Sequence, residues 1–95
     1  MMDGKLYRLK EKLIDNLDLP MDVALGIPKI TIIGKKEISI ENHKGILKFE
    51  EDELRVSTSL GVIQIRGENF EIVFVGGTTI TIRGIFISVG YETYE

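Results

Sequence analysis

The fold is indicated most clearly by residues 54–67, which read LRVSTSLGVIQIRG. Apolar and polar side chains alternate on both sides of a central Thr58-Ser59-Leu60-Gly61 segment. A period of two is typical of a β-strand with one buried face. The central segment supplies polar residues and then a glycine, which adopts positive φ at little cost. This stretch therefore predicts two antiparallel strands joined by a tight turn.

The same alternation extends outward from this stretch over most of the chain. The alternating apolar positions are Ile30/Ile32, Ile38/Ile40, Leu47/Phe49, Leu54/Val56, Ile63/Ile65, Phe70/Ile72/Phe74, Ile80/Ile82 and Ile85/Ile87/Val89. Short polar or glycine-bearing segments such as Gly67-Glu68-Asn69 and Gly76-Gly77 separate them, as expected of turns. No intervening segment is long enough for the helical crossover of a parallel sheet. We therefore predict a mainly β domain of about eight short antiparallel strands, as a meander, a roll or a short β-solenoid.

An internal repeat underlies this pattern. Gly45, Gly61 and Gly77 are 16 residues apart, and the sequence Ile-x-Ile-Arg-Gly occurs at residues 63–67 and again at 80–84. Such a period indicates either successive hairpins of a meander or coils of a small solenoid. Chance similarity among isoleucine-rich strands is a third explanation.

The N-terminal segment has a different period. Residues 3–17 predict an amphipathic helix, because leucines at three- and four-residue spacing mark one face. The basic side chains of this helix are Lys5, Arg8, Lys10 and Lys12. They are candidates for contact with anionic lipid or an acidic partner, or they are solvated while the leucines cover the domain's own sheet. The helix makes the fold class α+β, with residues 1–18 as the helix and 19–95 as the β domain.

The amino-acid composition excludes several classes of function for this protein. Ninety-five residues suffice for one domain, and the absence of cysteine excludes disulfides and thiolate metal sites. A net charge of -3 argues against a nucleic-acid binder that relies on neutralising phosphates. No apolar run approaches the ~20 residues of a transmembrane helix, and the N-terminal residues lack the continuous apolar stretch expected of a secretory signal. We expect a cytoplasmic protein, with peripheral attachment to a membrane left open.

Few residues of the sequence are candidates for a catalytic or metal-binding role. His43 is the only histidine, and Glu41 precedes it by two residues, so this turn could in principle supply acid–base catalysis. One histidine without a second ligand cannot build a zinc site, and a lone base is not a catalytic constellation. We therefore expect no enzyme activity, cofactor or metal, and interpret His43 as part of a hairpin turn. The alternative is a domain that binds or hydrolyses a small ligand or saccharide at the Glu41–His43 turn.

Two tyrosines close the chain. Tyr91 and Tyr94 combine an apolar ring with a polar tip, a combination favoured at interfaces. They are candidates for docking on the last strand or on a partner.

Several segments together resemble one known family. These segments are Leu19-Pro20-Met21-Asp22-Val23, Pro28-Lys29-Ile30-Thr31-Ile32-Ile33-Gly34, Ile40-Glu41-Asn42-His43-Lys44-Gly45-Ile46 and Thr58-Ser59-Leu60-Gly61. They are similar to the YabP/YqfC family of small proteins in endospore-forming Firmicutes, from about residue 19 to the Tyr91 tail. The resemblance implies a role in sporulation in the mother cell and association with a membrane-embedded sporulation protein. It implies no catalytic residue set for any position of this chain.

Taken together, the residues and the resemblance predict a non-enzymatic sporulation protein. It would act as an adaptor or assembly module through its sheet edges and N-terminal helix, with a protein partner or another copy of itself. Its expected location is the mother-cell cytoplasm, peripheral to the forespore membrane. No nucleic-acid partner is expected.

Overall fold

The computed structural model describes residues 25–92, which form a single antiparallel sheet of six strands. The strands are β1 (Lys29–Ile33), β2 (Glu37–Glu41), β3 (Gly45–Phe49), β4 (Glu53–Thr58), β5 (Gly61–Gly76) and β6 (Thr79–Tyr91). Their order across the sheet is β1-β2-β6-β5-β4-β3. The predicted antiparallel β architecture is confirmed. The helix expected over residues 3–17 lies outside the described residues.

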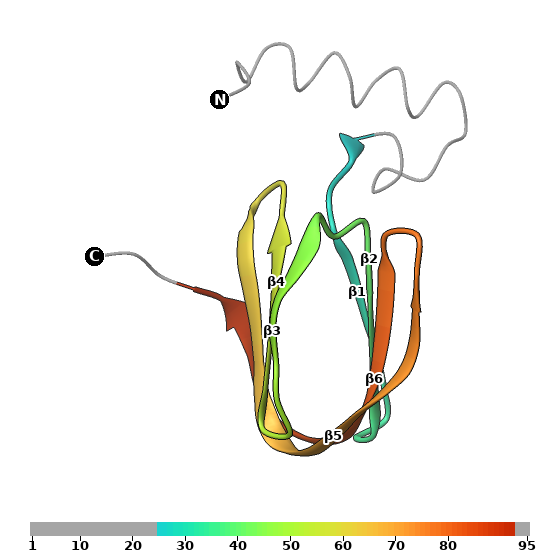
Figure 1. Cartoon of the computed structure of the whole chain (residues 1–95), viewed down its shortest axis with the longest axis vertical. Coiled ribbons are helices and arrows are strands. Elements are labelled where there is room, and N and C mark those ends of the chain that lie inside the picture. The colour runs from blue at the N-terminus through green and yellow to red at the C-terminus, as the bar shows by residue number, and fades with distance from the viewer. Residues whose placement is uncertain (1–24, 93–95) are drawn as a thin grey trace.

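The sheet is folded over on itself into a U (Figure 1). The two longest strands, β5 and β6, run the length of both arms and bend at the base of the U. In the first arm β3 and β4 flank the beginning of β5, and in the second arm β1 and β2 flank the beginning of β6. Of the three arrangements that the sequence left open, the structure is a roll, because β2 pairs with β6 instead of with β3.

The hydrophobic core lies between the two arms. The second arm contributes Ile38, Ile40, Ile80 and Ile82, the first contributes Leu54, Val56, Ile63 and Ile65, and Phe70 lies at the bend. Each of these side chains is at most 4% exposed. Burial of this set of large aliphatic side chains supplies the main driving force for folding, at roughly 1.5–3 kcal/mol for each fully buried residue. The alternating positions at the centre of the sheet are therefore the core that the sequence predicts.

The prediction of eight strands was wrong, and the reason lies at the bend. Gly67-Glu68-Asn69 does not form a hairpin turn; three register shifts in the β5–β6 ladder instead let the two strands curve and continue. A Cβ atom on Gly67 would lie 1.8 Å from the carbonyl oxygen of Ile85, and one on Gly84 would lie 2.7 Å from the Phe70 ring. These two glycines therefore permit a close approach of β5 and β6, which local sequence cannot distinguish from a turn.

The hairpin turns of the outer strands hold the bend in place. The backbone N–H groups of Gly67 and Phe70 donate to the carbonyl oxygens of Asp52 and Glu51 in the β3–β4 turn, at 3.0 and 2.8 Å. On the other arm the N–H of Gly84 donates to the carbonyl oxygen of Lys36 in the β1–β2 turn, at 3.1 Å. Backbone donors that the bulges remove from the ladder are thereby satisfied.

The 16-residue period has a simple structural origin. Gly45 begins β3, Gly61 begins β5 and Gly77 lies in the β5–β6 turn, and all three positions are at the open end of the U (Figure 1). The β3–β4 hairpin runs from the open end of the U to its base and back within one period. β5 covers the next period, running down the first arm and up the second. The two Ile-x-Ile-Arg-Gly segments occupy equivalent positions, since each leads one long strand into the bend.

Candidate interaction surface

Two segments of the long strands have a hydrogen-bonding edge with no neighbour among the described residues. The β4 ladder ends at Arg66, so residues 71–76 of β5 pair only with β6. The β2 ladder ends at Arg83 and the N–H of Gly84 still donates to the carbonyl oxygen of Lys36, so residues 85–91 of β6 pair only with β5. We call these segments the β5 edge and the β6 edge. An unpaired edge presents a row of free N–H and C=O groups to which another strand can bind.

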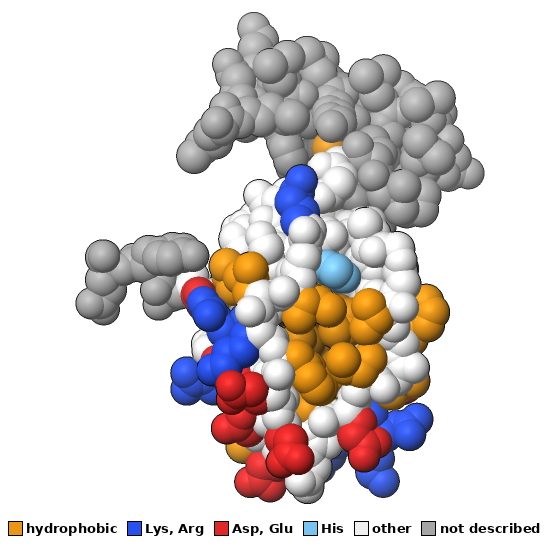
Figure 2. All heavy atoms as spheres, viewed as in Figure 1, with side chains coloured by type: hydrophobic (Ala, Val, Ile, Leu, Met, Phe, Trp, Pro, Cys, Tyr) orange, Lys and Arg blue, Asp and Glu red, His pale blue; other side chains and the backbone are white. Residues whose placement is uncertain are grey.

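The β5 edge is apolar over four consecutive residues. Ile72, Val73, Phe74 and Val75 are 46%, 45%, 53% and 51% exposed. Ile72 and Val75 stand opposite the buried Ile82 and Ile80, so they point to the inner face of the roll and yet remain half exposed. Figure 2 shows hydrophobic side chains gathered between the two arms, with charged side chains around the base of the U. Along the β5 edge, the hydrophobic core is therefore exposed to solvent.

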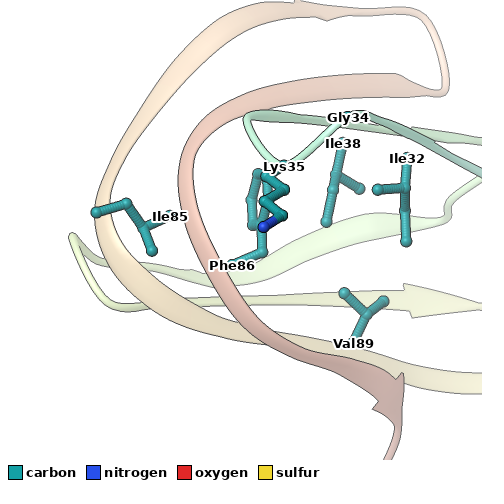
Figure 3. Close-up of a pocket in the computed structure, with 7 residues that line it drawn as sticks. All are labelled: Ile32, Gly34, Lys35, Ile38, Ile85, Phe86 and Val89. Atoms are coloured by element: carbon teal, nitrogen blue, oxygen red, sulfur yellow. The ribbon is translucent and has the colours of Figure 1, made fainter.

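The β6 edge borders a cleft of about 410 Å³. Its lining residues are Ile32, Gly34, Lys35, Ile38, Ile85, Phe86 and Val89. Ile32 and Ile38 belong to the β1–β2 hairpin, and Phe86 and Val89 belong to β6, so the cleft separates the two arms (Figure 3). The wall is apolar apart from Lys35, whose side chain lies beside Phe86 in this view. The cleft offers an apolar surface with one cation and no converging set of polar groups.

The outer face of the first arm carries charged pairs. Arg55 donates from Nε and Nη2 to the two carboxylate oxygens of Glu92, with Nη2 and Oε2 3.0 Å apart, and so ties the end of β6 to β4. Lys48 Nζ lies 2.7 Å from Glu53 Oε1, and Gln64 donates to Oε2 of the same carboxylate. The hydrogen bond from Lys48 lowers the pKa of Glu53 below its usual 4.5, and the one from Arg55 does the same for Glu92.

These pairs predict a loss of stability in acid. A carboxyl group with a lowered pKa in the folded state stabilises the fold fully above its unfolded pKa near 4.5, and this contribution disappears as the pH falls through the lower folded value. We expect the melting temperature to fall below about pH 4.5, and to fall less steeply in Glu53→Gln and Glu92→Gln. Melting curves recorded by circular dichroism across this pH range measure the effect. Identical acid slopes in the double variant and the wild type would contradict it.

The Glu41–His43 turn does not present an exposed imidazole. His43 is 9% exposed, and neither of its ring nitrogens has a hydrogen-bond partner within residues 25–92. Its backbone N–H donates to the carbonyl oxygen of Thr78 at 3.1 Å, which joins the β2–β3 connection to the β5–β6 turn. Glu41 is half buried at the end of β2, opposite Lys29. The segment bridges the two arms at the open end of the U, rather than forming the hairpin turn that the sequence suggested.

The remaining polar motifs have structural partners. The hydroxyl of Thr58 donates to the carbonyl oxygen of Gly61 at 2.7 Å and accepts from the Leu60 N–H at 3.1 Å. Ser59 Oγ donates to the carbonyl oxygen of Gly26 at 2.9 Å. Within residues 25–92, no group of three or more histidine, cysteine, aspartate or glutamate side chains is arranged to hold a metal ion.

The predicted contact residues are only partly within the described region. Tyr91 is the last residue of β6, stands opposite Ile63 and is 46% exposed. Lys5, Arg8, Lys10, Lys12 and Tyr94 lie outside the described residues. A role for any of these side chains in binding stays a prediction.

The β5 edge was missed at the level of sequence, although a signal for it exists. Residues 72–75 are four consecutive apolar residues. The alternating pattern predicts that Ile72 and Phe74 lie on the same face of a strand. In the structure the bulge between these two residues places Ile72 and Val75 on the inner face and Phe74 opposite Thr81. An uninterrupted β-branched and aromatic run without charge is the usual signature of a strand prone to pair with others.

Comparison with known proteins gives consistent matches over most of the chain. Residues 26–95 match the model of the YabP family. The chain is also 38% identical over 90 residues to "Uncharacterized protein YqfC" of Bacillus subtilis (strain 168), covering 95% of this chain and 97% of that protein. No helix in the described part of the structure is long and apolar enough to cross a membrane.

Proposed function

Since the chain belongs to the YabP family, we propose that it is a non-enzymatic adaptor or assembly module of endospore formation. It acts in the cytoplasm of the mother cell, peripheral to the forespore membrane, through contacts with other proteins. A membrane-embedded sporulation protein is the proposed partner at that membrane. The sporulation setting is supported by the resemblance of residues 19–91 to this family of spore-formers' proteins.

The observation that carries the mechanism is the pair of open edges on one small domain. The β5 edge and the β6 edge each expose large apolar side chains beside free backbone groups, up to 70% exposure at Ile87. An added strand on either edge would gain main-chain hydrogen bonds and bury these side chains, which is the usual basis of recognition by strand addition. Proteins that have no partner normally blunt such edges.

A ligand-binding or hydrolytic function at the Glu41–His43 turn is the rival. Small-molecule sites are concave and bring several polar groups together. His43 is instead buried with unpartnered nitrogens, and the described cleft is lined by other residues. This geometry supports the adaptor over the rival.

The decisive test compares edge variants with a His43 variant in a spore-forming host that lacks the chromosomal copy. Val73→Lys and Ile87→Lys place a charge on the β5 edge and the β6 edge, and His43→Leu removes the imidazole. Replacing an unsatisfied buried polar group by an apolar one is neutral or stabilising, so His43→Leu should melt at or above the wild-type temperature. We expect heat-resistant spores to fall to a small fraction of wild type in at least one edge variant and to stay normal in His43→Leu.

Thermal melts of each purified variant are the control for folding. Normal spore counts from the folded double edge variant would contradict the adaptor proposal. Loss of spores in a fully folded His43→Leu variant, with normal counts from both edge variants, would favour the ligand site instead.

A further inference from the structure

We infer that the β5 edge pairs with the β5 edge of a second copy of this chain, in antiparallel orientation about a two-fold axis perpendicular to the sheet. This inference rests on the proposed function, because it names the partner of one of the two open edges. The pairing would join the second arms of two rolls into one continuous sheet.

The first argument is that the β5 edge alone lacks protection against pairing. Residues 71–76 contain no lysine and no proline, and their one charge, Glu71, stands opposite Arg83 in the existing ladder. Charged side chains directed to an edge, above all lysine, and prolines are the usual devices that keep edge strands apart.

The three other edges of the sheet, which are the outer edges of β1 and β3 and the β6 edge, each have a lysine nearby. β1 begins with Lys29, and β3 carries Lys48 next to a register shift. The β6 edge borders the cleft that Lys35 lines together with Phe86. An approaching strand would have to displace or desolvate an ammonium group at each of these edges, which costs free energy. Residues 72–75 of the β5 edge are the place where a second strand meets only apolar side chains and backbone.

The second argument is that the β5 edge is self-complementary in one register. With the two-fold axis between Val73 and Phe74, Ile72 of one copy stands opposite Val75 of the partner subunit. Both residues point to the inner face in the structure, because the bulge between Ile72 and Phe74 puts them on the same side. The axis keeps inner faces on one side, so these four side chains would form one apolar strip that covers the open margins of both cores.

The same register avoids repulsion between charges. Glu71 of one copy stands opposite Gly76 of the partner subunit, so the two carboxylates lie at opposite ends of the paired segment. Like charges directly opposite each other would destabilise the pair. In this register Val73 stands opposite Phe74 of the partner subunit, and aromatic side chains pair favourably with β-branched ones across strands.

The expected strength follows from the size of the edge. Four half-exposed side chains supply roughly 300–400 Å² per copy, less than the ~800 Å² per partner of a standard interface. A reversible dimer in the micromolar range is therefore expected for the isolated protein, with more stable pairing when a common partner holds two copies together.

The first experiment measures the mass of the full chain by sedimentation equilibrium from about 0.1 µM to about 100 µM, a range that brackets micromolar dissociation constants. We expect the mass to rise from 10.7 kDa towards twice this value. Val73→Lys should stay at the monomer mass, and Ile87→Lys, on the β6 edge, should dimerise like the wild type. Melting curves show whether both variants are folded. A wild type that is monomeric throughout, or a Val73→Lys variant that dimerises normally, would overturn the inference, as would growth beyond the dimer.

The second experiment tests the register and does not depend on a charged variant that could fail to fold. The chain contains no cysteine, so introduced cysteines report only on their own contacts. Ile72→Cys/Val75→Cys should give a disulfide-linked dimer in high yield under mild oxidation, whereas either single variant and the Ile85→Cys/Ile87→Cys pair should give little. Equal yields from the two pairs would refute the β5 pairing.

Failure here and failure of the proposed function are separable. A monomeric wild type combined with loss of spores in an edge variant would reject self-pairing and retain the adaptor, with a different protein on the edge. A dimer abolished by Val73→Lys, combined with normal sporulation of the folded double edge variant, would retain self-pairing and reject the adaptor function.

Discussion

Replacing Gly67 by alanine should abolish the native fold or destabilise it severely. The new methyl carbon would lie 1.8 Å from the carbonyl oxygen of Ile85 and 2.8 Å from Cε1 of Phe70. The oxygen belongs to the backbone of β6 and cannot move aside without separating the two strands at the bend. Overpacking a core typically costs about 1–3 kcal/mol, and a rigid backbone obstacle places this variant at or above the upper end of that range.

Urea unfolding of purified Gly67→Ala measures this effect, with Gly90→Ala as the matched control. Gly90 lies in β6 and has nothing within 4 Å of the position of an added Cβ. Its replacement should change the free energy of unfolding by no more than about 0.5 kcal/mol. If Gly67→Ala were as stable as Gly90→Ala, the close crossing of β5 and β6 at the bend would be wrong.

Phe70→Ala is the second change with a large expected effect. Phe70 is 4% exposed, and its ring centroid lies 5.5 Å from that of Phe86 in a tilted arrangement. The ring also fills the space above Gly67 and Gly84, where added Cβ atoms would collide with it. Truncating such a buried ring leaves a cavity that costs about 3–5 kcal/mol.

For a domain of this size, a loss of 3 kcal/mol corresponds to a fall in Tm of about 12 °C or more. Phe74→Ala is the matched control, because Phe74 is in the same strand and is 53% exposed. It should lower the free energy of unfolding by less than about 1 kcal/mol in the monomer, since most of its area is already in water. Similar melting temperatures for the two variants would show that Phe70 is not the centre of the bend.

The alternating pattern located the centre of the sheet but not its margins. The predicted inward positions Ile38, Leu54, Ile65 and Ile82 are fully or almost fully buried. Ile32 and Ile72 follow the same local pattern, and both are about half exposed. A two-residue period in the sequence predicts which face of a strand each side chain is on. Whether that face is covered depends on which strand lies beside it, and that is a matter of non-local pairing.

The same distinction applies to the candidate surface. The sequence raised the Glu41–His43 turn as a site because of residue type, and packing between the arms buries its imidazole. The two open edges follow from where the β2 and β4 ladders end, at Arg83 and Arg66. No local property of residues 71–76 indicates that these residues have no neighbouring strand on the side away from β6.

Period, turn chemistry and chain length, all local properties of the sequence, thus determined an antiparallel β domain, its central core and its turn at Gly76-Gly77. The tertiary structure alone decided that the two Ile-x-Ile-Arg-Gly segments end in a bend instead of a turn. The reason is steric: Gly67 is required by the carbonyl oxygen of Ile85 and Gly84 by the ring of Phe70, each more than a dozen residues away along the chain. Because β5 and β6 continue through the bend, they are longer than the strands beside them. The parts of β5 and β6 that extend past β4 and β2 form the open edges on which the proposed assembly depends.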